Sequence, residues 1–172
     1  MKRTIFALCL GAIAAAIAGC GGDSSSASGG KEAESSAKQA SAPEDAGAAV
    51  VSARKVGDLG KVLVDSEGRT LYDFHKDKHS LYSAFSSACY GACAEDWPPL
   101  LTNTEPEAEE GASTTKLSTL QRKDGTLQVT YYGNPLYTYV GDKKPGEANG
   151  NDVTAFGGQW YALQPSGSEP KD

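Results

Sequence analysis

The sequence has little positive charge and few apolar residues for a fully folded chain. Its 172 residues include 16 Lys and Arg against 22 Asp and Glu, for a formal net charge of −6, and no basic run is longer than two residues. We therefore expect no binding to nucleic acid, because such binding needs a basic surface. Apolar residues make up 39% of the chain, and it contains 20 Gly and 8 Pro. This composition is typical of a chain of which only part folds.

Catalytic motifs are also missing. The chain has two His, His75 and His79, and its sequence contains no nucleophile elbow, phosphate-binding Gly loop, zincin helix or EF-hand loop. A chain of 172 residues can form one modest domain with tails, but not two ordinary hydrophobic cores. We expect one small domain and no enzymatic activity.

The longest apolar run lies near the N-terminus. Two basic residues precede an uncharged stretch at 5–18, which is short for a bilayer span of about 20 residues and typical of a secretory signal. The stretch ends in Ile17-Ala18-Gly19-Cys20, which resembles the lipobox of bacterial lipoprotein precursors. The resemblance implies that residues 1–19 are removed as a signal peptide and that Cys20 is lipidated. Two or three acyl chains hold a protein stably on a membrane, whereas one does not.

The segment after the signal is predicted to be a linker. Residues 20–55 contain no aromatic residue and few bulky aliphatic ones, so they cannot bury enough apolar surface to offset the entropy lost on ordering. We predict a disordered, flexible linker with a reach of roughly 30–35 Å. Residues 165–172 have a similar composition and are predicted to form a disordered tail.

The folded domain is predicted at 56–164, where all eight Tyr, both Trp and both His lie. Alternating apolar and polar residues there are typical of strands, and Gly-containing turns join them into two hairpins. The predicted strands are 61–65, 69–74, 116–122, 126–132, 135–140 and 159–164. An exposed acidic loop is expected at 103–113 and a short helix within 83–93. The fold class is therefore all-β, as a small antiparallel sheet, a sandwich or a barrel-like domain.

An internal repeat divides this domain. Residues 68–78 and 133–143 match at an offset of 65 residues in the pattern Gly-x-x-Leu-Tyr-x-aromatic-x-x-Asp-Lys. A second match joins Trp97…Leu100 to Trp160…Leu163. We predict two tandem β repeats, at about 56–102 and 116–164, that share one core because neither can bury its own face.

The repeat resembles a family of secreted bacterial lipoproteins described as a secreted repeat of unknown function. The motif Tyr-x-(Phe/Trp/Tyr)-x-x-Asp occurs twice, and residues 89–100 are similar to the signature Cys-x-Gly-x-Cys-Ala-x-x-Trp-Pro-Pro-Leu. The motif residues are Tyr72, Phe74, Asp77, Tyr137, Tyr139, Asp142, Trp97, Pro98 and Pro99. The aromatic ones lie two apart on a strand face, which predicts an aromatic seam between the repeats. The resemblance implies no established activity.

Cys89 and Cys93 are the thiols that remain beside Cys20 once the signal is removed. Two cysteines so close in an exported protein usually form a disulfide, and Gly91 suits the tight bend that this requires. We predict a disulfide that fixes the Trp-Pro-Pro segment against the core. A redox pair or a thiolate metal site is the alternative.

His75 and His79 supply ligand types that suit zinc or copper. Neighbouring lysines disfavour a cation, and an oxidised cysteine pair offers no thiolates, so we expect two solvated loop histidines and no cofactor. Copper or haem bound at these histidines is the alternative. Asp77 and Asp142 are expected to accept backbone N–H bonds at the turns that end their strands, although paired carboxylates for acid–base chemistry are the other interpretation.

These observations predict a membrane-anchored lipoprotein on the extracytoplasmic face of the cell envelope. Its domain is expected to be a non-enzymatic binding or structural module, with an unidentified protein, glycan or small molecule as partner. The alternative is a redox-related or metal- or haem-binding lipoprotein that uses His75, His79 or the Cys89/Cys93 pair.

Overall fold

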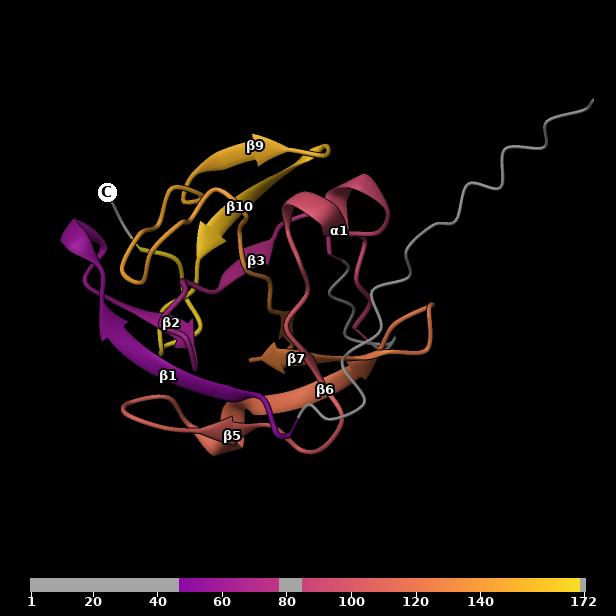
Figure 1. Ribbon diagram of the computed structural model, residues 1–172, viewed down its shortest axis with the longest axis horizontal. Helices are drawn as coiled ribbons and strands as arrows, with labels where there is room; N and C mark the ends of the chain where they lie inside the picture. Colours follow the sequence, from indigo (N-terminus) through magenta and orange to yellow (C-terminus); the bar gives the residue numbers. More distant parts are fainter. Residues whose placement is uncertain (1–46, 78–84, 171–172) are drawn as a thin grey trace, which may run out of the picture. The chain divides into compact units, whose positions relative to one another are not determined.

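The computed structural model describes residues 47–77 and 85–170 (Figure 1). The predicted signal peptide, the predicted lipidation site at Cys20 and His79 lie outside these ranges. Short strands dominate the described residues: β1 (Val50–Lys55), β2 (Lys61–Asp65), β3 (Tyr72–Phe74), β4 (Leu101–Thr102), β5 (Glu107–Ala108), β6 (Leu117–Gln121), β7 (Leu127–Tyr131), β8 (Asn134–Pro135), β9 (Val153–Ala155) and β10 (Gly158–Ala162). The described residues also include one α-helix, α1 (Ala92–Asp96), and 3-10 turns at Gly57–Leu59 and Thr114–Lys116. None of the helices described is long and apolar enough to cross a bilayer.

The strands form three small sheets. Their orders are β2-β1-β5, β3-β10-β9 and β4-β7-β6, with β8 added to β7. Figure 1 shows β3, β10 and β9 on the opposite side of the view from β6 and β7. All neighbours are antiparallel except β1 and β5, which run parallel. The all-β prediction is confirmed, whereas the barrel-like alternative is wrong, since the described strands do not close into a barrel.

The first repeat's hairpin is completed by a segment of the second repeat. The turn at 66–68 brings Leu71 back beside Leu63, and the Leu71 N–H donates to the Leu63 carbonyl at 2.9 Å. The Leu63 N–H donates in turn to Leu163 at 2.7 Å, and the Leu163 N–H donates to Leu71 at 3.0 Å. Three backbone segments thus hydrogen-bond in a closed ring, and one of them comes from the far end of the chain.

The second repeat's hairpin repeats this arrangement with a segment of the first. The Leu136 N–H donates to Val129 at 3.0 Å, Val129 donates to Leu100 at 2.9 Å, and Leu100 donates to Leu136 at 2.9 Å. The segment after Trp97 therefore completes the second hairpin, and the segment after Trp160 completes the first. Since buried backbone groups need partners, each repeat depends on the other for its hydrogen bonds.

The predicted linker is wrong at its C-terminal end. Residues 50–55 form β1, which pairs along its length with β2 and is buried at Val51 and Ala53. A short apolar stretch next to a Gly, Ser and Ala-rich segment has too few residues to show strand alternation. Its burial comes instead from tertiary contact with β2, which is itself buried on both faces.

Four other local predictions need correction. The tail is ordered over residues 165–170, where the Gln164 N–H donates to the Ser168 carbonyl at 2.9 Å. The acidic loop at 103–113 contains β5, and the helix begins at Ala92, near the end of the range expected for it. Beyond β8, residues 136–140 contribute backbone bridges to two other segments rather than a regular strand.

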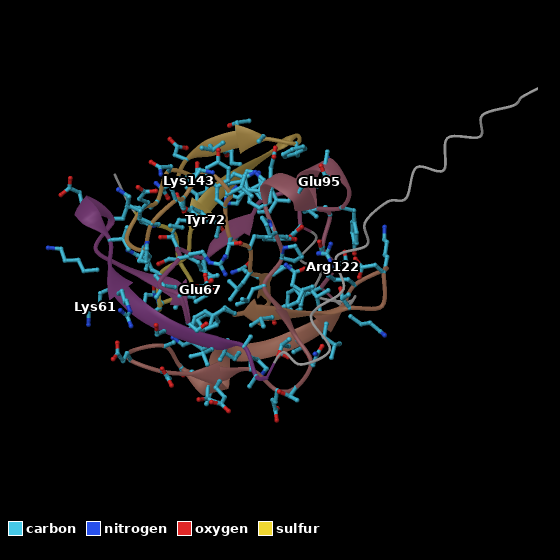
Figure 2. The ribbon with its side chains drawn as sticks, viewed as in Figure 1. Lys61, Glu67, Tyr72, Glu95, Arg122 and Lys143 are labelled. Atoms are coloured by element: carbon cyan, nitrogen blue, oxygen red, sulfur yellow. A yellow bond between two sulfur atoms is a disulfide. The ribbon has the colours of Figure 1, made fainter. Side chains whose placement is uncertain are left out.

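The interior holds two clusters of apolar side chains on either side of β2. One collects the aromatic residues of both repeats with the cysteines, and the other collects Leu and Val from β1, β2 and β7 with Tyr131. Figure 2 shows Tyr72 inside the molecule while Lys61 extends from its edge. A buried aromatic side chain removes ~150–250 Å² from water, which corresponds to about 4–6 kcal/mol of transfer free energy.

Candidate functional site

The motif tyrosines and aspartates pair across the repeats. The Tyr72 hydroxyl donates to Asp142 Oδ2 at 2.6 Å, and the Tyr137 hydroxyl donates to Asp77 Oδ2 at 2.9 Å. The backbones of the two tyrosines are also bridged, with N–H to carbonyl distances of 2.9 and 3.0 Å. The Tyr of each copy is therefore satisfied by the Asp of the other copy, and the motif works as a reciprocal lock.

The second oxygen of each aspartate holds a loop. Asp77 Oδ1 accepts the Ala88 N–H at 2.7 Å, and Asp142 Oδ1 accepts the Asn149 N–H at 2.8 Å. These carboxylates accept backbone N–H bonds as expected, but from residues 11 and 7 positions further along the chain rather than from the turns that end their strands. Sequence reasoning also missed their tyrosine partners. Burial raises the pKa of Asp77 to about 6. Because all four oxygens are engaged, this arrangement is suited to holding the fold rather than to acid–base chemistry.

Aromatic rings from both repeats stack in one column. Phe74 lies on Trp160 and Trp160 on Trp97, with ring centroids 4.0 Å apart in each case, and Trp97 lies on Tyr139 at 4.2 Å. Tyr72 and Tyr137 meet the column edge-on at Trp97 and Trp160, at 5.3 and 5.2 Å. The predicted aromatic seam is confirmed. Its order alternates between the repeats, so the column also depends on both copies.

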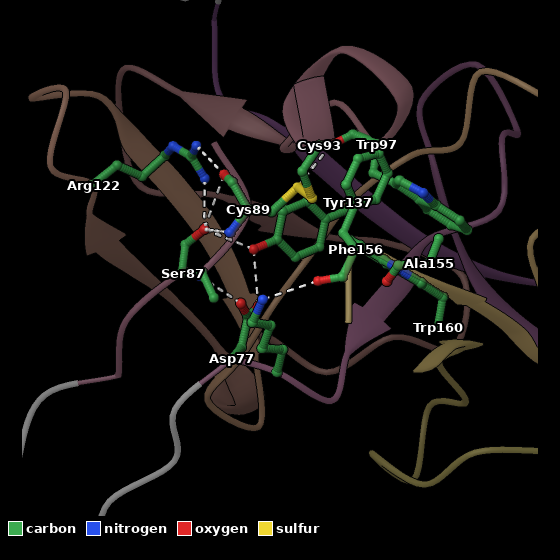
Figure 3. The surroundings of a disulfide bond; sticks show 12 residues. Asp77, Ser87, Cys89, Cys93, Trp97, Arg122, Tyr137, Ala155, Phe156 and Trp160 are labelled. Atoms are coloured by element: carbon green, nitrogen blue, oxygen red, sulfur yellow. Dashed lines mark hydrogen bonds between the residues drawn. A yellow bond between two sulfur atoms is a disulfide. The ribbon is translucent and has the colours of Figure 1, made fainter. Parts of the chain in front are cut away.

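A disulfide joins Cys89 and Cys93, as predicted, beside Trp97 and Tyr137 (Figure 3). Both cysteines are buried, and the Trp97 N–H donates to the Cys93 carbonyl at 2.8 Å. Gly91 bends the enclosed loop with a φ of +58°, which favours glycine. The alternative of a thiolate metal site does not fit this structure, because the two sulfurs are bonded to each other. Pro98 and Pro99 follow as a backbone segment that pairs with the second repeat near Tyr137.

A buried arginine links the disulfide loop to the Tyr137 lock. The Arg122 guanidinium is inside the molecule and donates to Ser87 Oγ at 2.9 Å and to the Cys89 carbonyl at 2.8 Å (Figure 3). It also donates to Gln128 Oε1 at 2.7 Å. Ser87 Oγ lies 2.8 Å from the Tyr137 hydroxyl, which continues the network to the aspartate. Arg122 is part of an Arg-Lys-Asp-Gly turn, where basic residues are normally exposed to solvent, so its burial could not be predicted from the sequence.

A second group of titratable side chains lies outside this lock, where β3 ends. Donor atoms of Asp73, His75 and Glu169 lie within 4.8 Å of one another, and His75 Nε2 is hydrogen-bonded to Glu169 Oε1. Asn134 and Gly167 line the same surface hollow. His75 is therefore close to carboxylates rather than to the cysteine pair, and its predicted partner His79 lies outside the described residues.

The electrostatics of this group are unusual at Asp73. Its side chain is only 7% exposed, and Oδ1 has no hydrogen-bond partner among the residues that the structure describes. Burial, followed by the nearby charge of Glu169, raises the pKa of Asp73 to about 7. His75 and Glu169 are partly exposed, at 40% and 35% of their side chains. Sequence reasoning missed Asp73 and Glu169, because 96 residues separate them.

Comparison with known proteins agrees with the repeat structure. Residues 53–101 and 118–164 each match the family described as a secreted repeat of unknown function. Neither a curated protein nor a solved structure matches the chain significantly. The two matched segments include both hairpins, both tryptophans and both Tyr–Asp motifs. The chain therefore belongs to this family of secreted repeats and carries two copies of the repeat.

Proposed function

We propose that this chain is a lipid-anchored lipoprotein of the cell envelope whose double repeat is a non-enzymatic binding or structural module. The observation that carries the proposal is the reciprocal lock. The polar groups that define the family motif, the hydroxyls of Tyr72 and Tyr137 and the carboxylates of Asp77 and Asp142, hydrogen-bond to one another inside the fold. A motif used in this way stabilises a scaffold and offers no nucleophile or base to a substrate.

Anchoring through Cys20 is supported by the lipobox at 17–20 and by the charge of the chain. A formal net charge of −6 gives no electrostatic attraction to anionic lipids, so stable attachment needs the acyl chains themselves. The family description, a secreted repeat, agrees with a domain outside the cytoplasm. A lipid anchor followed by a Gly- and Ser-rich segment would display the domain away from the bilayer.

The role as a binding module is supported by what the surface offers. Large apolar side chains are exposed at Phe85, Tyr132 and Phe156, with exposed fractions of 43%, 53% and 37%. Aromatic side chains of this kind are enriched at contacts with proteins and other ligands. Nucleic acid is not an expected partner, given the excess of acidic residues.

The anchor is tested by fractionating cells that express the chain or its Cys20→Ala variant. We expect the unchanged chain in the membrane fraction with a lipid on an N-terminal Cys20 by mass spectrometry, and the variant released or left as an unprocessed precursor. Cys9→Ala is the matched control, because this residue lies within the predicted signal, and it should behave as the unchanged chain. A Cys20→Ala chain that is processed and still bound to membranes would overturn the proposed anchor.

The binding role is tested by crosslinking in intact cells followed by purification of the chain. We expect one partner to be captured reproducibly, and Phe85→Ser or Tyr132→Ser to reduce its capture without changing the melting temperature. Lys61→Ser, on the exposed end of β2, is the control substitution. Capture that is the same for all variants would place the contact away from these aromatic residues and contradict this part of the proposal.

The metal-binding alternative is favoured by one observation, the two carboxylates beside His75. Among residues 47–77 and 85–170, no comparable group of side chains favours haem.

A further inference from the structure

Asp73 and His75 lie on the face of β3 that the aromatic core does not use. Side chains alternate along a strand, so Tyr72 and Phe74 enter the interior while Asp73 and His75 share the other face. Asp73 stands opposite Tyr161 of β10, and the His75 ring contacts Tyr161 with centroids 4.9 Å apart. Asp73 is thus fixed by a paired strand, and His75 directly after it is held by the bond from its N–H to the Gln159 carbonyl at 2.9 Å.

The second repeat supplies an internal comparison for these positions. At the offset of 65 residues, Asp73 corresponds to Thr138 and His75 corresponds to Val140. Thr138 is as buried as Asp73, at 7% exposure for both. The corresponding segment of the second repeat is therefore built without a carboxylate or an imidazole, which indicates that the repeat fold does not itself require them at these positions.

The buried carboxylate of Asp73 is unfavourable without a ligand. A buried carboxylate oxygen that lacks a hydrogen bond carries a desolvation cost, and Asp73 Oδ1 has no partner within the described parts of the chain. The Glu169 carboxylate, which has a ligand atom within 4.8 Å of one on Asp73, adds electrostatic repulsion. A bound cation would remove both penalties at once.

Glu169 reaches this face from an ordered turn. The Pro165 carbonyl accepts hydrogen bonds from Lys116 Nζ at 2.9 Å and from the Tyr131 hydroxyl at 3.0 Å. These contacts fix the start of the C-terminal segment against the second repeat. The fold therefore places the main chain that carries Glu169 beside this face, while the Glu169 side chain remains partly exposed.

We propose that Asp73, His75 and Glu169 bind a divalent transition-metal ion, best represented by zinc. One imidazole and two carboxylates are common zinc ligands and balance its charge, whereas magnesium and calcium prefer oxygen alone and copper(I) prefers sulfur. Three protein ligands leave a fourth position open to water or to a ligand on a partner.

Zinc binding requires only small side-chain movements: His75 and Glu169, which are hydrogen-bonded to each other, must separate slightly to admit the ion between them, while Asp73 is already near. Tetrahedral zinc places its ligand atoms roughly 3.3–3.6 Å apart, and the three side chains present donor atoms within 4.8 Å of one another. His75 and Glu169 are partly exposed and can rotate. Lys76, which would repel a cation, instead donates from Nζ to the Phe156 carbonyl at 2.9 Å.

The test is zinc binding to the full chain, purified in detergent and stripped with a chelator. Calorimetric titration with zinc chloride should give one ion per chain, with no comparable heat from magnesium chloride. Glu169→Gln and Asp73→Thr, the latter a residue that the second repeat holds at this position, should each weaken zinc binding roughly tenfold or more. His79→Ala and Glu109→Gln, an acidic residue in a different surface segment, should leave it unchanged.

A spectroscopic measurement identifies the histidine. The chain has two imidazoles, so the His79→Ala variant has one, and its ¹⁵N signals should shift on addition of zinc. Glu169 is on the surface, and its Gln variant remains informative if Asp73→Thr fails to fold.

Other outcomes would overturn the site. An unchanged zinc affinity in both Asp73→Thr and Glu169→Gln would contradict the proposal. Zinc binding that is lost in His79→Ala but kept in Glu169→Gln would also contradict it, because the ion would then be bound by the two histidines. Equal binding of magnesium would show only a non-selective acidic surface. This inference goes beyond the proposed function and does not depend on the lipid anchor.

Discussion

Tyr137 connects its Tyr–Asp lock to the hydrogen-bond network of the buried Arg122. Its hydroxyl donates to Asp77 and lies within hydrogen-bond distance of Ser87, which also receives a bond from Arg122. The equivalent Tyr72 makes a simpler pair with Asp142 and also receives the Gly150 N–H at 3.3 Å. The two locks thus share the Tyr–Asp hydrogen bond but differ in the additional hydrogen bonds that each tyrosine hydroxyl makes.

Removing the Tyr137 hydroxyl should therefore destabilise the fold without opening a large cavity. Tyr137→Phe leaves the ring in place but takes a donor from a buried carboxylate, and we expect a loss of about 1–3 kcal/mol in the free energy of unfolding. Urea denaturation measures it. Tyr132→Phe, on an exposed ring, is the control and should change stability by less than about 0.5 kcal/mol. A Tyr137→Phe chain as stable as this control would contradict the assigned role of the lock.

Alkaline pH should test the same hydroxyl in another way. Burial, and then the neighbouring Asp77 charge, raise the pKa of Tyr137 above its ordinary value of 10. Above that pH the folded chain holds a proton that the unfolded chain has released, so the free energy of unfolding must fall as pH rises beyond about 10. We expect Tyr137→Phe to lose stability less steeply than the unchanged chain between about pH 9 and 11. Equal slopes for the two proteins in that range would show that Tyr137 ionises normally.

At the scale of elements, the hairpins were predictable and their partners were not. Residues 61–74 and 116–135 show strand alternation around Gly-containing turns. The expected hairpins form, including the β7–β8 pair that enters the second backbone ring. The sequence pattern of a strand does not depend on whether the third segment of each backbone ring comes from the same repeat or from the other one. The origin of that segment could therefore not be predicted. The exchange of Leu100 and Leu163 is decided by contacts far apart in sequence.

The candidate site was predicted in part for the same reason. Histidine at position 75 was recognised as a possible ligand, but the sequence pairs it with His79 because those two are close along the chain. The structure pairs it with Glu169, which is 94 residues away. Asp73 occupies an unspecified position of the family motif, so its burial could be seen only once β3 was paired with β10.

Strand exchange makes a prediction for separated repeats. Fragments 1–110 and 111–172 each contain one hairpin together with the segment that completes the other, so neither should fold alone. We expect near-ultraviolet circular dichroism to be absent from each fragment and to return when the two are mixed in equal amounts. A mixture of either fragment with a Leu100→Asp or Leu163→Asp version of its partner is the control and should not recover the signal. A folded single fragment would show that each repeat pairs within itself.

At the scale of the whole domain, the interlocked repeats should unfold together. The ring column takes Trp97 from the first repeat and Trp160 from the second, and their centroids are 4.0 Å apart. Neither repeat can lose its structure without opening this column and both Tyr–Asp locks. Small domains without separable parts unfold in one cooperative transition, so we expect a single midpoint by every probe.

Two single-tryptophan variants can test this cooperativity, because each reports on a different repeat. Trp97→Phe and Trp160→Phe will both lower stability, since each replaces a buried indole by a smaller ring. Within each variant, however, the fluorescence midpoint in urea should equal the midpoint from far-ultraviolet circular dichroism. In Trp97→Phe the fluorescence comes from Trp160 and reports on the second repeat. In Trp160→Phe it comes from Trp97 and reports on the first repeat. Midpoints that separate in either variant would mean that one repeat survives the unfolding of the other, which the exchanged backbone rings do not allow.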